Sequence, residues 1–228
     1  MKLSVRNLSI LGAFGVLASL VGCVTNPDTR AGTEQELRTV NATLSDFQRD
    51  PNMTWFRDHL RDARAVIISP SVTRAGFVFG GSGGEAVVLS RDPATRQWVG
   101  PAFYNMGAGS VGFQIGVDVS EVIMLVMTEK AVNALLSPSF KLGGDISVAA
   151  GPVGTGAGAN IMADVISFAR AKGVYAGISL EGVVIAPDSK ANGAFYGRPA
   201  SPVDILVRKN VESPASLSLR QSLSRLAG

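Results

Sequence analysis

Cysteine and histidine, the residues most used in metal and catalytic sites, are nearly absent from this chain. Among its 228 residues there is one cysteine, Cys23, and one histidine, His59. A single cysteine excludes an intramolecular disulfide. With one histidine and no cysteine cluster, the usual zinc ligand sets are not available, and a histidine-based catalytic triad would have to use His59. We therefore predict no metal, no cofactor and no enzymatic activity.

Charged and aromatic side chains are also scarce. Charged residues make up 17% of the chain and aromatic residues 7%, whereas there are 26 glycines. This composition favours strands and turns over a helix bundle, and the length is enough for one large domain with a substantial core. The formal net charge of +3 falls to +1 when Lys2 and Arg6 are removed with the leader described next. Because no clustered basic stretch remains, no nucleic-acid partner is expected.

Residues 1–22 have the pattern of a signal peptide. Lys2 and Arg6 precede the apolar run Leu8–Val21, which is too short to span a membrane comfortably. The run ends in Leu20-Val21-Gly22-Cys23, and small residues before a cysteine at this position resemble the lipobox of bacterial lipoproteins. The resemblance implies cleavage before Cys23 and its acylation by palmitate or related fatty acids, and several acyl chains anchor a protein stably where one does not. The alternatives are an ordinary signal peptide or an uncleaved anchor helix with an incidental cysteine.

The residues after the lipobox predict a location and a domain plan. Val24, rather than an aspartate, follows Cys23, which in the sorting pattern of Gram-negative lipoproteins favours the outer membrane of the cell envelope. Residues 23–33 are polar with proline and glycine, so we expect a lipidated tether. A single domain is expected over 34–212 and a helical tail over 213–228. The leucines of the tail either dock on the domain, which we favour, or lie on anionic lipid; they are Leu219, Leu223 and Leu226.

Two helices are predicted at the start of the domain. Thr33 and Glu36 have the spacing of a capping box, and apolar residues continue at helical spacing until Asp50-Pro51. A second helix is expected to begin near Asn52. It carries arginines whose guanidinium groups match phosphate oxygens, although the same residues, interleaved with acidic ones, also fit an ordinary solvated face. These candidate headgroup-binding residues are Arg57, Arg61 and Arg64.

From Ala65 onward, short apolar runs are separated by glycine, which is the pattern of a strand-rich core. Ala65–Ser69 is predicted to be a strand that ends at Pro70, and Gly80–Gly84 a flexible turn. Arg170–Ala186 alternates apolar and polar residues up to Gly182, which predicts a half-buried strand followed by a hairpin or a bulge. Further predicted elements are strands at Val122–Val126, Ala163–Ala169 and Ala200–Arg208, and helices at Thr128–Leu136 and Asp188–Tyr196.

An ordered set of sequence blocks resembles the SYLF domain family, a lipid-binding and actin-regulator domain of eukaryotic endocytic proteins and many bacterial lipoproteins. The resemblance covers residues 40–197 and implies an α+β fold: a curved, largely antiparallel β-sheet or partly open barrel with N-terminal helices and short packed helices. It also implies affinity for phospholipid headgroups rather than catalysis. The blocks are Ala63–Pro70, Gly76–Gly84, Trp98–Phe103, Gly109–Gly116, Gly143–Gly154, Lys172–Gly182 and Asn192–Gly197.

One departure from the family concerns the segment before the domain. Eukaryotic members engage membranes there through a basic amphipathic helix, whereas the segment Glu34–Asp50 of this chain is mainly acidic. Its acidic residues Glu34, Glu36, Asp46 and Asp50 outnumber Arg38 and Arg49. Phosphoinositide specificity is therefore not carried over to this chain.

These features together predict a membrane-anchored envelope lipoprotein that binds phospholipid headgroups or another amphiphile and is not catalytic. One alternative is an envelope scaffold that recruits a protein partner through a sheet edge or the C-terminal helix. The other alternative is an enzyme that acts on lipid or cell wall. It would need carboxylates such as Asp145 and Asp164 to lie together in a cleft.

Overall fold

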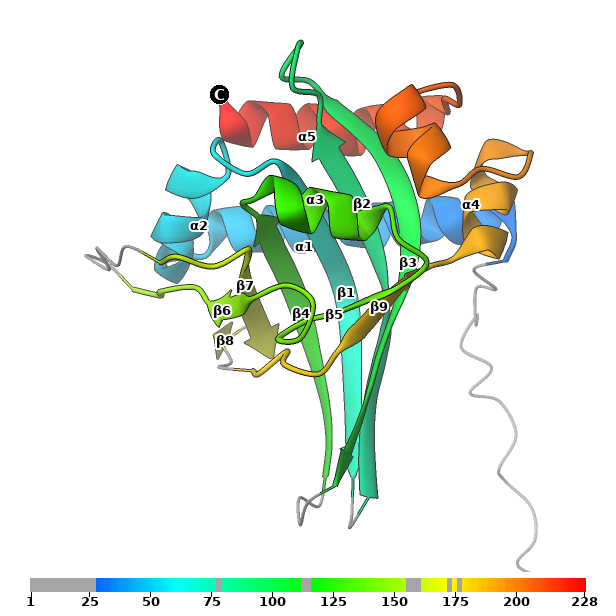
Figure 1. Ribbon diagram of the computed structural model, residues 1–228. Coiled ribbons are helices and arrows are strands. Elements are labelled where there is room, and N and C mark those ends of the chain that lie inside the picture. Colours follow the sequence, from blue (N-terminus) through cyan, green and yellow to red (C-terminus); the bar gives the residue numbers. More distant parts are fainter. Residues whose placement is uncertain (1–27, 77–78, 112–115, 155–160, 172–173, 176–177) are drawn as a thin grey trace, which may run out of the picture.

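The chain folds around one curled β-sheet. The computed structural model describes residues 28–76, 79–111, 116–154, 161–171, 174–175 and 178–228. Nine strands form a sheet with the order β5-β9-β3-β2-β1-β4-β7-β6, and β8 pairs with β7. The pairings between these strands are antiparallel except for β6 with β7. The sheet curls into a half-barrel with helices packed on it (Figure 1), so the predicted α+β fold is confirmed.

The strands β1 to β4 are long and lie at the centre of the sheet, and β5 to β9 are shorter. The strands are β1 (Ala65–Gly76), β2 (Phe79–Arg91), β3 (Trp98–Val111), β4 (Gly116–Val126), β5 (Phe140–Lys141), β6 (Val148–Ala150), β7 (Val165–Ala171), β8 (Val174–Tyr175) and β9 (Val184–Pro187). The α-helices are α1 (Arg30–Arg49), α2 (Thr54–His59), α3 (Glu129–Leu135), α4 (Ser189–Tyr196) and α5 (Leu217–Ala227). Single turns of 3-10 helix lie at η1 (Pro51–Met53) and η3 (Pro214–Ser216), and a π-helical turn at η2 (Val203–Arg208).

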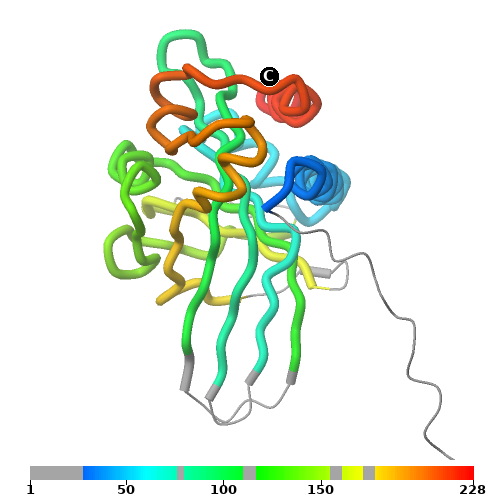
Figure 2. The backbone as a smooth tube through the Cα atoms, turned by 90° about the vertical axis from the view of Figure 1, so that its right-hand side faces the viewer, coloured from blue at the N-terminus to red at the C-terminus, as the bar shows by residue number. Residues whose placement is uncertain are grey.

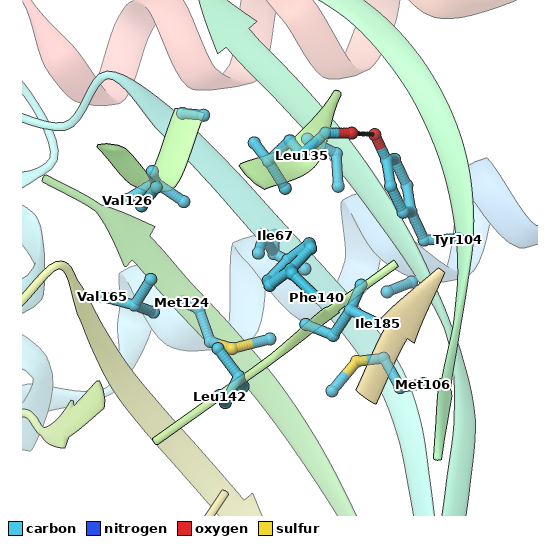
Figure 3. Close-up of a cluster of buried hydrophobic side chains, with 14 of the residues drawn as sticks. Ile67, Tyr104, Met106, Met124, Val126, Leu135, Phe140, Leu142, Val165 and Ile185 are labelled. Atoms are coloured by element: carbon cyan, nitrogen blue, oxygen red, sulfur yellow. Dashed lines mark hydrogen bonds between the residues drawn. The ribbon is translucent and has the colours of Figure 1, made fainter. Parts of the chain in front are cut away.

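The two faces of the sheet each carry a hydrophobic core. Successive residues of a strand point to opposite faces, so Val66 and Ile68 of β1 pack under α1, α2, α4 and α5, which we call the helix side. Ala65 and Ile67 face the other side, which α3, η2 and the loops around β5 cover. On that side Tyr104 donates a hydrogen bond from its hydroxyl to the Leu135 carbonyl at 2.6 Å (Figure 3).

Arg170, on β7, joins the end of α1 to the sheet. Its side chain is 11% exposed, with Nε 3.1 Å from Asp50 Oδ2 and Nη1 3.2 Å from Glu121 Oε2. The guanidinium lies over the Phe47 ring, 5.5 Å from the ring centroid, and Thr43 donates to Glu121 Oε1 at 3.0 Å. Because a buried cation is stable only when anionic partners surround it, this cluster fixes α1 relative to β4 and β7.

The lower parts of β1 to β4 extend past the helices as a four-stranded blade (Figures 1 and 2). We define the blade as the described residues 73–76, 79–84, 107–111 and 116–119. The predicted flexible turn at Gly80–Gly84 is wrong, because these glycines lie inside β2, where all of them pair with β3 and all but Gly84 also pair with β1. The predicted strand end at Pro70 is also wrong. β1 continues through Pro70 with a register shift between Ser69 and Val72, since a bulge tolerates a residue that lacks an N–H.

Several other predicted boundaries are corrected. α1 begins at Arg30 with Thr29 as its N-cap, so the Thr33 and Glu36 pair is not a capping box. The strand predicted before Gly182 is described only as the end of β7 and the short β8; residues 172–173 and 176–177 lie outside the described residues. The predicted break at Gly182 is confirmed by a turn there, but the strand that follows, β9, pairs with β3 and β5 and does not form a hairpin with β8. The strand predicted at Ala200–Arg208 is instead the π-helical turn η2, whose Ile205 and Leu206 are buried.

Other predictions are confirmed. Val122–Val126 is a buried strand, Thr128 caps α3, and Asp188 caps α4. Leu219 and Leu223 of α5 are buried in the same core as α1, which confirms that the C-terminal helix docks on the domain.

Replacing Arg170 by alanine is expected to destabilise the protein by about 3–5 kcal/mol, because it leaves the buried carboxylate of Asp50 without its cation. Urea unfolding followed by circular dichroism measures this loss. The control is Arg38→Ala, whose exposed guanidinium bonds to the Gln35 side chain and whose loss should cost less than about 0.5 kcal/mol. Equal urea midpoints for Arg170→Ala and Arg38→Ala would show that the ion pairs of Arg170 do not fix α1 on the sheet.

Candidate functional site

The three arginines predicted to bind headgroups do not form one surface. Arg57 donates from Nη1 to the carbonyls of Asp50 at 2.6 Å and Gln48 at 3.1 Å, so it closes the C-terminal end of α1. Arg64 forms an ion pair with Glu129 at the start of α3. These contacts give Arg57 and Arg64 structural roles, and Arg61 is the member of the set that lies at a pocket.

Arg61 lies beside two arginines from the hairpin between β2 and β3. Arg91 and Arg96 both donate to the Arg61 carbonyl, Arg96 from Nη2 at 3.0 Å. The three side chains line a pocket of about 370 Å³ at the upper end of the sheet, beside the end of α5. We call this the arginine pocket; its lining is Arg61, Asp62, Arg91, Arg96, Trp98, Ser224, Ala227 and Gly228.

The arginine pocket holds donors that lack acceptors. Burial and the neighbouring Arg96 lower the pKa of Arg91, while Asp62 acts in the opposite direction. Arg91 lies over the indole of Trp98, 4.8 Å from the ring centroid. Among the described residues, the Nε of Arg91 and the indole Nε1 of Trp98 are buried without a hydrogen-bond acceptor. An anion with several oxygens, such as a phosphate, would offset the repulsion between the guanidinium groups and accept their hydrogen bonds.

Sequence reasoning missed Arg91 and Arg96. They lie in a polar hairpin about which the sequence indicates only a turn, and their approach to Arg61 depends on the pairing of β2 with β1. No local pattern of charge or spacing reports that pairing.

Glu36 of α1 is a buried carboxyl group on the helix side of the sheet. It is 9% exposed, and its Oε1 has no hydrogen-bond partner among the described residues. Burial, together with the nearby carboxylates of Glu85 and Asp188, raises the pKa of Glu36 to about 8. The residue is therefore neutral in the folded protein near neutral pH, and it packs α1 on the sheet without a counter-charge.

Below α1, none of the described helices covers the helix side of the blade. By strand register its residues form two rows across β3, β2, β1 and β4, in which Gly83 pairs with Gly107 and Gly81 pairs with Gly109. Val117 is 74% exposed and Val119 is 49% exposed. None of these side chains is charged. We call this surface the glycine face; it consists of Thr73, Ala75, Gly81, Gly83, Gly107, Gly109, Val117 and Val119.

The carboxylates considered for catalysis are held by their own neighbours. Asp164 accepts hydrogen bonds from Thr128 Oγ1 at 2.7 Å and from Ser147 N and Oγ at 2.9 Å. These bonds lower the pKa of Asp164 to about 2. Asp145 accepts from the Lys141 amide at 2.8 Å. Across the described part of the chain, no group of three or more His, Cys, Asp or Glu side chains is placed to hold a metal ion.

Cys23, the predicted acylation site, lies outside the described residues. Within the ranges that the structure describes, none of the helices has the length and apolar character needed to cross a membrane.

Comparison with known proteins identifies similar chains. A family model described as Ysc84, Las17-binding protein actin regulator, matches residues 107–226. Protein YSC84 of Saccharomyces cerevisiae is 29% identical over 217 residues, covering 90% of this chain and 46% of the relative. SH3 domain-containing YSC84-like protein 1 of Xenopus laevis is 35% identical over 133 residues, covering 56% of this chain and 39% of the relative.

A fission-yeast relative shows the same partial coverage. SH3 domain-containing protein PJ696.02 of Schizosaccharomyces pombe is 35% identical over 145 residues, which are 60% of this chain and 33% of the relative. This chain therefore spans between a third and a half of the length of these curated relatives.

The buried Glu36 carboxyl group predicts that stability falls as pH rises. The folded state keeps the proton up to about pH 8, whereas the unfolded chain releases it near 4.5. Between these values the folded state binds more protons, so the free energy of unfolding decreases with pH, by about 1.4 kcal/mol for each pKa unit of difference. Urea unfolding at pH 5, 7 and 8.5 should show a decline that Glu36→Gln reduces, and the pKa of Glu85, which burial and Asp188 also raise, accounts for the part that remains.

The matched control for this prediction is Glu34→Gln, which changes an acidic residue of the same helix that pairs with Arg30 at the surface. Its pH profile should follow that of the wild type. A wild-type profile as flat as that of Glu36→Gln would contradict the assignment of a neutral Glu36.

Proposed function

The chain belongs to the Ysc84 (SYLF) family, and from this premise we propose that it is a non-catalytic, membrane-anchored envelope lipoprotein whose domain binds phospholipid headgroups. The family description names a Las17-binding actin regulator, but the chain covers less than half of the length of the relatives compared above. The actin-related role is therefore stated of those relatives only. The family model matches residues 107–226 of this chain.

The observation that carries the headgroup proposal is the arginine pocket. It brings together Arg61, Arg91 and Arg96 from two parts of the chain, with one acidic side chain, Asp62, among its lining residues. Guanidinium groups bind phosphate through paired hydrogen bonds, and the buried donors of Arg91 and Trp98 are without acceptors among the described residues. A phosphate group at this pocket would balance the charge of the three guanidinium groups.

The anchor proposal depends on the N-terminal sequence. The apolar run Leu8–Val21 followed by Gly22-Cys23 supports cleavage and acylation at Cys23, with the outer membrane as the destination. An acyl anchor holds the domain close to lipid, which raises the effective concentration of lipid at the surface of the domain.

A scaffold function remains the second candidate. The sheet offers unpaired positions on described strands, since the pairing of β3 with β9 ends at Gly107 and that of β4 with β7 ends at Ser120. Such edges pair with an added strand of another protein. Crosslinking in cells separates the two candidates, because a scaffold gives one dominant protein partner and no dependence on the arginine pocket.

Metabolic labelling with palmitate tests the anchor. The wild-type protein should incorporate label and float with outer membranes, and Cys23→Ser should lose the label, because the chain has no other cysteine. Val24→Asp serves as the sorting control and should keep the label while moving the protein to the inner membrane. Equal labelling of wild type and Cys23→Ser would exclude acylation at this residue.

Vesicle flotation tests the headgroup site. A chain of residues 24–228 should bind vesicles containing anionic phospholipid, and Arg61→Glu with Arg96→Glu should weaken binding at least tenfold, since each basic residue near an anionic surface contributes about 1 kcal/mol. Arg38→Glu in the same chain is the control, because it also replaces a positive charge by a negative one but lies away from the pocket. Unchanged binding of the double variant, or absence of binding by the wild type to any vesicle, would contradict the proposal.

A further inference from the structure

We propose that the glycine face of the blade is the surface that lies on the membrane holding the N-terminus, in contact with the acyl chains just below the headgroups. This inference rests on the proposed function for the identity of the ligand as a phospholipid bilayer. It goes further by assigning the apolar contact to one face of four strands and by fixing the orientation of the domain.

The first support is the polarity of the two faces of the blade. The glycine face carries no charge, and its largest side chains, Val117 and Val119, are exposed. The opposite face is polar: Arg74 donates to the Ser179 carbonyl at 2.7 Å, and Asp118 accepts from Ser120 at 3.1 Å. The uncharged face can meet lipid without the cost of dehydrating a charge, and the opposite face cannot.

The fold does not require glycine at these positions. A Cβ atom at Gly109 would meet nothing within 4 Å, and one at Gly83 would come no closer than 3.6 Å to another heavy atom. By contrast, a Cβ at Gly84, which points to the other face, would lie 2.4 Å from the Ser71 carbonyl oxygen. Glycine inside a strand lowers the stability of that strand. Packing within the fold therefore does not explain why glycine occupies these positions.

A bilayer is the occupant that suits such a face. The backbone groups of β1 and β2 are paired on both sides within the blade, so apart from the Thr73 hydroxyl the face presents carbon atoms and paired peptide groups, with no charge to dehydrate. A fluid hydrocarbon needs no complementary shape. The open edges of β3 and β4 limit the depth, because unpaired strand edges are not stable in the hydrocarbon core. The blade therefore lies at the interface rather than spanning the membrane.

A second copy of this chain is a poorer occupant. Two rows of residues across four strands spaced about 4.8 Å apart cover roughly 250 Å². Stable dimers bury about 800 Å² on each partner, so the glycine face is too small to hold two copies together.

The position of α1 agrees with this orientation. α1 lies on the same side of the sheet as the glycine face and begins at Arg30. The seven residue-to-residue steps from Cys23 to Arg30 reach at most about 24 Å. The strand β2 extends only about 17 Å from Glu85, which lies near Glu36, to Gly80. A tether of that length allows the blade to touch the membrane that holds Cys23.

The arginine pocket lies at the other end of the same strands, since Arg91 ends β2 and Trp98 begins β3. Figure 1 shows the blade below and the hairpin between β2 and β3 above, on opposite sides of the helices. One flat bilayer therefore contacts the glycine face or the arginine pocket, but not both. In this orientation the pocket points away from the anchoring membrane.

Depth-dependent fluorescence quenching tests the orientation in the full chain. Cys23→Ser makes an introduced cysteine the single thiol, and the apolar run Leu8–Val21 keeps the chain in phosphatidylcholine vesicles. An environment-sensitive label is placed by Val117→Cys on the glycine face, by Asp118→Cys on the opposite face, or by Thr95→Cys near the arginine pocket. Doxyl-labelled phosphatidylcholine should quench the label at position 117 at least threefold more than the labels at 118 and 95.

Each other result is informative. Equal quenching at positions 117 and 118 overturns the assignment of the membrane contact to one face. Strongest quenching at position 95 shows that the pocket end of the domain meets the bilayer. That result overturns the inference and leaves the headgroup proposal standing. If no label is quenched, the domain does not touch lipid, and the inference fails. Adding Val119→Glu to the Val117→Cys chain should reduce quenching to the level at 118; unchanged quenching would exclude an apolar contact.

Discussion

The placement of α1 on the sheet is the constraint on which the rest of the molecule depends. Arg170 holds one end of the helix through Asp50 and Glu121, and the neutral Glu36 packs the other half beside Glu85 and Asp188. The two contacts use opposite solutions to the same problem of burying ionisable groups. At Arg170 the charge is compensated by carboxylates, whereas Glu36 retains its proton because burial and the nearby carboxylates of Glu85 and Asp188 raise its pKa.

This placement divides the long strands into a covered part and a bare part. Above α1, the strands are packed on both faces and end at the hairpin that brings Arg91 and Arg96 to Arg61. Below α1, the same strands continue as the blade, with no helix on the glycine face (Figure 2). Cationic and uncharged surfaces are thus separated by the length of a strand. A protein tethered to one membrane can in this way present different chemistry towards the lipid and away from it.

The sequence predicted much of the fold and little of the site. The helical stripe of α1 and the buried run Val122–Val126 follow from periodicity, because one face or both faces of the element are apolar. The strand character of Gly80–Gly84 could not be predicted, since glycine favours turns locally and its pairing with the distant strands β1 and β3 holds it extended. Arg57, Arg61 and Arg64 recur at helical spacing, which suggests one shared face. Their tertiary contacts instead place them at a helix end, at a pocket and in an ion pair, respectively.

The glycines of the blade also resolve a conflict between solubility and membrane contact. Apolar side chains at Gly81, Gly83, Gly107 and Gly109 would increase the area that binds hydrocarbon, but they would also create a flat hydrophobic sheet with open edges, which promotes aggregation. Charged side chains would prevent aggregation and would also prevent contact with acyl chains. Glycine avoids both outcomes at the expense of intrinsic strand stability, and the long pairing of β2 with β1 and with β3 compensates for that loss. A weak apolar surface of this kind is sufficient only if the domain is already held at the membrane, which links the bare face to the anchor proposed at Cys23.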